Sequence, residues 1–163
     1  MEARHELDDA IEVLARDVVR LLGGRRIAAA ESCTAGRITT ALACVEGAAT
    51  FLAGGVVAYA TDVKRSLLDV TAPSVLSIEA VEQMARGVAD LLGAEVGVST
   101  SGVAGETSED GVRPGTVFIA TSVDGRLTSR EHHLGGAPED VAAQAARQAL
   151  DDLEQDLRAV HER

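Results

Sequence analysis

The sequence predicts an α/β fold: a single domain over residues 1–163 with three layers, α/β/α, around a mixed sheet of about five strands. Three observations lead to this prediction. Apolar segments typical of buried strands alternate along the chain with segments of helical spacing. A length of 163 residues suits one domain with a proper core but not two. The residues are 46% hydrophobic with only two Phe, one Tyr and no Trp, so the core must be aliphatic and closely packed.

The first predicted element is an amphipathic helix that ends at Gly23-Gly24. Its apolar stripe comprises Leu7, Ala10, Ile11, Leu14, Val18, Leu21 and Leu22. A buried strand then begins at Ile27, and a sharp polar turn leads from it into a second helix. That helix carries Ile38, Ala41, Leu42 and Val45, and Gly47 stops it. Ser32 or Thr34 is a plausible N-cap for it.

The middle of the chain predicts a strand, two helices and another strand. Residues 53–60 indicate a second buried strand with a glycine-rich start. Thr61 and Asp62 can cap the short helix that follows, and Pro73 ends that pattern. A longer helix begins at Ser77 and closes at Gly93, before a strand over 95–100.

The last third of the chain predicts a hairpin and a final helix. Residues 106–113 form a polar loop, and two β-type segments over 116–123 and 126–134 flank Asp124-Gly125. Asp-Gly in this setting is a strong hairpin signal. Pro138 then opens the last helix at a first helical position. Its apolar positions are Val141, Ala145, Ala149, Leu153, Leu157 and Val160.

The charge balance excludes several functions. The formal net charge is −11, from 26 acidic and 15 basic residues, and no basic run relieves it. Nucleic-acid binding is therefore not expected, because affinity for the backbone depends on neutralising phosphates. No apolar stretch is long enough to span a bilayer and the N-terminus lacks a signal-peptide core, so we expect no membrane association and a cytoplasmic protein.

The cysteines and histidines do not predict a metal site or a disulfide framework. Two cysteines, Cys33 and Cys44, are too few for disulfides and are not spaced as zinc ligands. Cys44 is most simply a small core residue on the apolar side of its helix. Cys33 is ambiguous between a nucleophile and a packing residue. The histidines do not change this interpretation; they are His5, His132, His133 and His161.

Three polar turns follow predicted strands, at residues 31–34, 59–64 and 101–105. Ligands of open α/β sheets gather beyond the carboxyl ends of the strands. If these strands are parallel, the three turns meet at one edge of the sheet. They would bring together a hydroxyl, a lysine, a phenol and the backbone amides of glycines.

This convergence suggests nucleophilic catalysis by Ser32. A serine needs a base, no histidine lies in the three turns, and Lys64 is the available group. A lysine with an ordinary pKa of ~10.4 is protonated near neutrality, so Lys64 would need burial or a cationic neighbour. Tyr59 could relay the proton or hold the substrate. Taken singly, Lys64 fits a solvated helix residue and Tyr59 a core aromatic.

The turn after the first strand also feeds a helix N-terminus. Backbone N–H groups there suit a phosphate, a carboxylate or the oxyanion of acyl transfer. The alternative is a capping turn without chemistry, because Ser and Thr are common caps.

Several motifs, in order along the chain, resemble the CinA C-terminal domain family, also called PncC. They are residues 30–36 (AESCTAG), 55–59 (GVVAY), Lys64 with 67–70 (LLDV), 100–105 (TSGVAG) and 115–120 (GTVFIA). The resemblance covers roughly Leu7 to Leu153 and implies a stand-alone version of the domain. It implies a nicotinamide-nucleotide amidase, which converts nicotinamide mononucleotide to nicotinate mononucleotide and ammonia. It implies no metal or organic cofactor, a small nucleotide as substrate, and a homo-oligomer.

Carried over by position, the resemblance implies that Ser32 is the nucleophile and that Tyr59 and Lys64 are catalytic. Backbone amides of the first and third turns would stabilise the oxyanion. The substrate-binding residues expected from these turns are Glu31, Cys33, Thr34, Ala35, Gly36, Ser101, Gly102, Ala104 and Gly105.

The sequence departs from the family's pattern in places. Ala35, Ser101 and Glu106 stand where glycine, threonine and proline are usual, and residues 135–142 lack the usual arginines. A second hypothesis therefore stays open, that of a catalytically silent or substrate-shifted member that binds a nucleotide or a protein. A third is a redox or acyl-transfer protein that uses Cys33.

Overall fold

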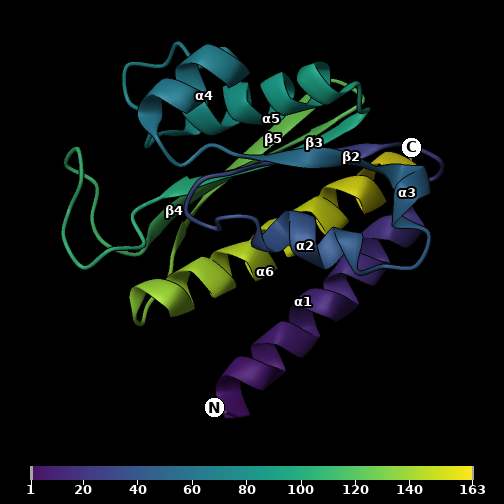
Figure 1. Ribbon diagram of the computed structural model, residues 1–163, viewed down its shortest axis with the longest axis horizontal. Helices are drawn as coiled ribbons and strands as arrows, with labels where there is room; N and C mark the ends of the chain where they lie inside the picture. The colour runs from purple at the N-terminus through teal and green to yellow at the C-terminus, as the bar shows by residue number, and fades with distance from the viewer. Residues whose placement is uncertain (1, 163) are drawn as a thin grey trace.

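The computed structural model describes residues 2–162, and its strands form one five-stranded sheet between two layers of helices (Figure 1). In chain order, the elements are α1 (Glu2–Leu21), β1 (Ile27–Glu31), α2 (Arg37–Ala43), α3 (Ala48–Phe51), β2 (Leu52–Val57), α4 (Thr61–Leu68), α5 (Ile78–Leu92), β3 (Val96–Gly102), β4 (Thr116–Val123), β5 (Arg126–His133) and α6 (Pro138–His161).

The sheet is mixed, as the sequence predicts. Its strand order is β2-β1-β3-β4-β5. Strand β1 pairs in parallel with both β2 and β3, while β4 pairs antiparallel with β3 and β5. The carboxyl ends of β2, β1 and β3 therefore meet at one edge of the sheet, and the turn that follows each strand begins there.

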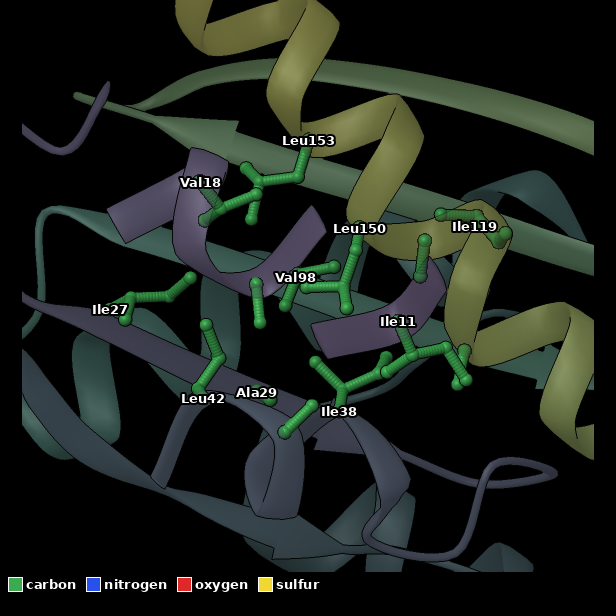
Figure 2. Packing of buried hydrophobic residues seen from close by; sticks show 14 of the residues in the cluster. Ile11, Val18, Ile27, Ala29, Ile38, Leu42, Val98, Ile119, Leu150 and Leu153 are labelled. Carbon is green, nitrogen blue, oxygen red and sulfur yellow. The ribbon is translucent and has the colours of Figure 1, made fainter. Parts of the chain in front are cut away.

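Helices cover both faces of the sheet, which confirms the three-layer prediction. Figure 1 shows α1, α2 and α6 on one face and α4 and α5 on the other. On the first face, side chains of the three helices pack against β1, β3 and β4 (Figure 2); those labelled are Ile11, Val18, Ile27, Ala29, Ile38, Leu42, Val98, Ile119, Leu150 and Leu153. On the second face, Val81, Met84 and Val88 of α5 cover Ala28 and Ala30 of β1.

Small residues allow the layers to approach closely. Gly97 of β3 lies directly beneath α5, where an added Cβ would overlap the backbone carbonyl oxygen of Ala85. The buried hydrophobic residues of the described chain include only two aromatic ones, Phe51 and Phe118. The core is thus aliphatic and tightly layered, as the composition predicts.

The prediction of a buried second strand is wrong in one respect. Strand β2 stands at the edge of the sheet, with partly exposed residues, and Val57 at its end is 52% exposed. An apolar run does not reveal whether its strand has one neighbour or two. The strand also ends at Val57, which leaves Tyr59 in the turn that follows. The short helix α3 was not predicted, because four residues are too few to show a helical period.

The predicted caps are only partly correct. Ser77 caps α5, since its hydroxyl accepts a hydrogen bond from the N–H of Ala80 at 3.1 Å. Neither Ser32 nor Thr34 caps α2, whose N-cap is Gly36 with a φ of 95°. The N-cap of α4 is Ala60 rather than Thr61 or Asp62.

Cys44 is exposed, so its predicted place in the core is wrong. The reason is that α2 ends at Ala43 and does not continue to Gly47, which leaves Cys44 beyond the apolar face of the helix.

No helix within residues 2–162 is long and apolar enough to cross a membrane.

Candidate active site at the carboxyl edge of the sheet

A cavity of about 310 Å³ lies where the three parallel strands end. It receives residues from all three polar turns. The first turn contributes Ser32 and Cys33, the second Tyr59, Thr61 and Lys64, and the third residues 102–105. The remaining lining residues are Val75, Leu76, Thr107, Ser108 and Glu109. The structure therefore brings together the hydroxyl, the lysine, the phenol and the glycine backbone that the sequence placed at one edge.

Ser32 is the first residue after β1 and is held by the sheet. Its backbone N–H donates to the carbonyl oxygen of Thr100 at 3.1 Å, which extends the pairing with β3 by one residue. The side chain lines the cavity and is only 6% exposed. Within the part of the chain that the structure describes, no group hydrogen-bonds to the Ser32 hydroxyl. Its proton and lone pairs are therefore available to a ligand in the cavity.

The buried carboxylate of Glu31 holds the turn that contains Ser32. It accepts hydrogen bonds from the hydroxyl of Thr34 at 2.7 Å, from the N–H of Ile38 at 2.8 Å, and from both the N–H and the hydroxyl of Thr39 at 2.9 and 2.7 Å. The N–H groups of Ile38 and Thr39 belong to the first turn of α2, where backbone donors lack intrahelical partners. Glu31 thus supplies the negative charge and the acceptors that the start of α2 requires.

The predicted substrate-binding residues separate into two groups. Four line the cavity, and these are Cys33, Gly102, Ala104 and Gly105. The other five lie outside it, and these are Glu31, Thr34, Ala35, Gly36 and Ser101.

The residues outside the cavity have identifiable structural contacts. The Thr34 hydroxyl contacts Glu31 and also the hydroxyl of Thr100 at 2.9 Å. Ser101 donates to the carbonyl oxygen of Val75 at 2.7 Å. Ala35 and Gly36, with φ values of 48° and 95°, form the bend into α2 and line a separate hollow beside α1.

Lys64 is buried in the wall of the cavity, with 3% exposure, so its interpretation as a solvated helix residue is wrong. Its Nζ donates a hydrogen bond to the carbonyl oxygen of Tyr59 at 3.0 Å. Burial lowers the pKa of Lys64 from its ordinary value of 10.5, and attraction to Cys33 and Glu109 opposes that shift in part. A lysine in this setting gives up its proton more readily than one in water.

Tyr59 lies between β2 and α4 at the mouth of the cavity. It is 70% exposed, so its interpretation as a core aromatic is wrong. The edge position of β2 explains this exposure, because no further strand covers the segment that follows it. Tyr59 is the one aromatic residue among those described that line the cavity.

Cys33 is buried, and burial raises the pKa of its thiol to about 11. A hydrogen bond with Thr100 and attraction to Lys64 oppose this shift but do not cancel it. The thiol is therefore protonated near neutrality, whereas the thiolate is the reactive form of cysteine. This environment gives no support to a cysteine nucleophile.

The third turn offers backbone donors to the cavity. The N–H of Val103 donates to the carbonyl oxygen of Thr116. Among residues 2–162, nothing accepts a hydrogen bond from the N–H of Ala104 or Gly105, the next two residues. Both free N–H groups belong to residues that line the cavity. They are suitable donors for a negatively charged oxygen of a bound ligand.

Sequence reasoning missed the part of the cavity that comes from the loop between β3 and β4. Glu109 and Val112 in this loop pair through two backbone hydrogen bonds of 3.1 and 2.8 Å, which flank Asp110-Gly111. The signal was present in the sequence, since Asp-Gly is a preferred two-residue hairpin turn. The residues that flank it lack a β-type pattern, so the sequence predicted only a polar loop over residues 106–113.

A model of the CinA C-terminal domain matches residues 11–157 of this chain. The chain belongs to the CinA C-terminal domain family. Curated relatives with CinA names are similar in sequence. The putative competence-damage inducible protein of Desulforamulus reducens is 37% identical over 150 residues, which cover 89% of this chain and 36% of that protein. A CinA-like protein of Thermotoga maritima is 36% identical over 149 residues, which cover 86% of this chain and 36% of that protein.

This chain thus spans about a third of the length of the curated CinA relatives that it matches. Solved structures of CinA superfamily proteins match over nearly their full length. One from Klebsiella pneumoniae has a TM-score of 0.87 at 35% identity, covering 91% of this chain and 98% of that one. One from Escherichia coli has a TM-score of 0.81 at 30% identity, covering 91% and 89%. These structures confirm the predicted fold.

Proposed function

We propose that this chain hydrolyses nicotinamide mononucleotide to nicotinate mononucleotide and ammonia, with Ser32 as the nucleophile and Lys64 as the base. The observation that carries the proposal is the burial of Lys64 in the wall of the cavity that Ser32 also lines. A lysine can serve as a base near neutrality only if its pKa is lowered, and burial lowers it here. Membership of the CinA family agrees with this proposal.

In the first step, the Ser32 oxygen attacks the carboxamide carbon while neutral Lys64 takes the hydroxyl proton. The carbonyl oxygen becomes an oxyanion. The N–H groups of Ala104 and Gly105 are the donors that we assign to it, because they line the cavity and have no acceptor among the described residues. Backbone donors in fixed positions stabilise such a charge without rearranging as it forms.

In the second step, the bond between carbon and nitrogen breaks. The protonated Lys64 returns its proton to the leaving nitrogen, so ammonia departs and an acyl ester remains on Ser32. Lys64, neutral again, takes a proton from a water molecule that attacks the ester carbon. Lys64 then gives this proton to the Ser32 oxygen as the ester bond breaks, so the acid is released and both the Ser32 hydroxyl and the neutral lysine are restored.

Tyr59 takes one of two roles in this proposal. Its exposed ring stands at the mouth of the cavity, where it can hold the substrate, and its hydroxyl can relay a proton. A Tyr59→Phe variant separates these roles. If only the ring acts, by holding the substrate, the variant keeps both kcat and KM. If the hydroxyl relays a proton, the variant loses kcat at constant KM.

The test is ammonia release from nicotinamide mononucleotide by the purified protein. Wild-type protein should release ammonia, and Ser32→Ala should release none while its melting temperature stays nearly unchanged. Cys33→Ala should retain measurable turnover. An active Ser32→Ala variant together with an inactive Cys33→Ala variant would contradict the assignment.

The same preparation tests the alternative of a silent binding module. If wild-type protein releases no ammonia yet calorimetry detects bound nicotinamide mononucleotide, the chain is a nucleotide-binding member of the CinA family and not an amidase.

A further inference from the structure

The charged groups of the cavity are few and opposite in sign. Among the described residues that line it, Lys64 is the one cationic side chain and Glu109 the one anionic side chain. The two attract one another, and this attraction partly restores the pKa that burial lowers at Lys64. Glu109 takes no part in the proposed reaction steps, so its charge beside the substrate has another effect.

The loop between β3 and β4 sets the position of Glu109. This loop extends from the sheet edge beyond the helices that cover the faces (Figure 1). Asp110 and Gly111 at its tip have φ values of 48° and 76°, the left-handed conformation of a tight two-residue turn. The backbone hydrogen bonds between Glu109 and Val112 close that turn. Glu109 therefore sits at the base of a defined turn and lines the cavity as an exposed residue.

The charge of the cavity depends on the state of Lys64. As a base, Lys64 must be neutral when the substrate is bound, and its attraction to Glu109 is then lost. The carboxylate of Glu109 remains as the one full charge on the described lining. A negative site of this kind binds a ligand whose nearby atoms carry positive charge. The formal net charge of −11 adds a long-range field of the same sign.

Tyr59 gives the cavity a second feature that favours a cation. It is the aromatic residue of the described lining, and its ring is largely exposed. The face of an aromatic ring attracts positive charge through its quadrupole. An anionic carboxylate and an aromatic face on the same cavity complement a flat, positively charged ring.

We infer that Glu109 is the counter-ion of the ring that carries the carboxamide, and that it gives the cavity its preference for a positively charged ring over a neutral one. This inference rests on the proposed function, since it takes the amide as the reacting group. Glu109 is then a specificity-determining residue and takes no part in proton transfer.

The test compares two ribosides that differ in ring charge. Nicotinamide riboside carries a pyridinium cation, and benzamide riboside is a neutral analogue of the same shape. Binding of each is measured by calorimetry on the Ser32→Ala variant, in which turnover is blocked. The cationic riboside should bind about 10-fold more tightly, and Glu109→Gln should abolish this preference.

Asp110→Asn is the matched control. It removes one negative charge from the adjacent position of the same loop, and asparagine tolerates the left-handed conformation found there. Asp110 does not line the cavity, so this variant should keep the preference for the cationic riboside. The control separates a contact of Glu109 with the ligand from a general loss of charge.

The inference is overturned if neither riboside binds, if both bind equally, or if the preference survives Glu109→Gln. Its failure is distinguishable from failure of the proposed function. Ammonia release by wild-type protein with equal binding of the two ribosides rejects the inference alone. A preference that depends on Glu109, without ammonia release, rejects the amidase and supports Glu109 as the counter-ion of the bound ring.

Discussion

Lys64 Nζ donates a hydrogen bond of 3.0 Å to the backbone carbonyl oxygen of Tyr59. The acceptor carries no formal charge, so this bond does not oppose the loss of a proton as an ion pair would. A neutral amine still has N–H donors, and the bond can persist while the nitrogen lone pair becomes available. This hydrogen bond therefore holds the Lys64 amine against the Tyr59 carbonyl group at the start of α4, whether the amine is protonated or neutral.

The first prediction concerns this lysine. Because burial lowers the pKa of Lys64 below 10.5, the amidase rate should rise with pH through an apparent pKa below that value. Arginine stays protonated over the whole range, so Lys64→Arg should lose at least ~100-fold in rate and lose this rise. The measurement is a pH–rate profile of ammonia release.

Lys64→Met is the control for stability. The folded state favours the neutral amine, so protonation of Lys64 disfavours folding below its folded pKa and the free energy of unfolding increases as pH rises through that value. Methionine removes the charge and should keep or raise the melting temperature while abolishing activity. Full activity in Lys64→Met would reject the base assignment.

The second prediction concerns thiol reactivity. Cys33 is buried with a thiol pKa of about 11, whereas Cys44 is exposed. The Cys33 thiol therefore stays protonated at pH 8, and the thiolate is the form that reacts. Iodoacetamide should therefore modify Cys44 and spare Cys33 in the native protein. Peptide mass spectrometry identifies the modified residue, and denatured protein, in which both react, is the control. Faster labelling of Cys33 would contradict its placement.

The third prediction concerns the buried carboxylate of Glu31. In Glu31→Gln, the amide nitrogen cannot accept the hydrogen bonds that one carboxylate oxygen receives from Thr39. The free energy of unfolding should fall by about 2–4 kcal/mol, because buried donors lose their acceptor. Urea denaturation measures this change. Glu46→Gln, at an exposed site, should change it by no more than ~0.5 kcal/mol. Equal stability of the two variants would contradict the role assigned to Glu31.

The fourth prediction concerns Ala35, which adopts a φ of 48°. The left-handed conformation costs an alanine about 1–2 kcal/mol but costs glycine little. After the greater chain entropy of unfolded glycine is subtracted, Ala35→Gly should stabilise the protein by about 0.5 kcal/mol. Ala43→Gly, at the last residue of α2, should destabilise it by about 0.5 kcal/mol. Thermal denaturation measures both, and the same sign at the two sites would refute the argument.

The fifth prediction concerns the contact between sheet and helix at Gly97. A methyl group there would meet the backbone carbonyl oxygen of Ala85, which cannot move without α5. Gly97→Ala should therefore lower the free energy of unfolding by about 2–3 kcal/mol. Gly135→Ala, where the space is open, should leave it within ~0.5 kcal/mol. Denaturant titration of the two variants distinguishes close packing from a general effect of alanine.

Local patterns in the sequence were enough to predict most of the elements. The apolar stripe of α1 and the Pro138 start of α6 are visible within a few turns of helix. The Asp124-Gly125 hairpin joins β4 and β5 at the predicted residues. These features depend only on residues close together in the chain, so they can be recognised from the sequence.

The convergence of the three turns could also be predicted, because it follows from strand direction alone. Parallel pairing of β1 with β2 and β3 brings the turns after them to one edge, whatever the details of packing.

By itself, therefore, the sequence determined the fold class, the hairpin and the edge of the sheet at which polar side chains gather. Only the tertiary structure decided which of those side chains face the cavity. Glu31 and Ser32 are adjacent, yet Glu31 turns inward to bind the start of α2 while Ser32 lines the cavity. Lys64 is buried and Tyr59 exposed, against expectation for both. The physical reason is that burial and hydrogen-bond partners depend on segments distant in the chain, and such contacts leave no period in the local sequence.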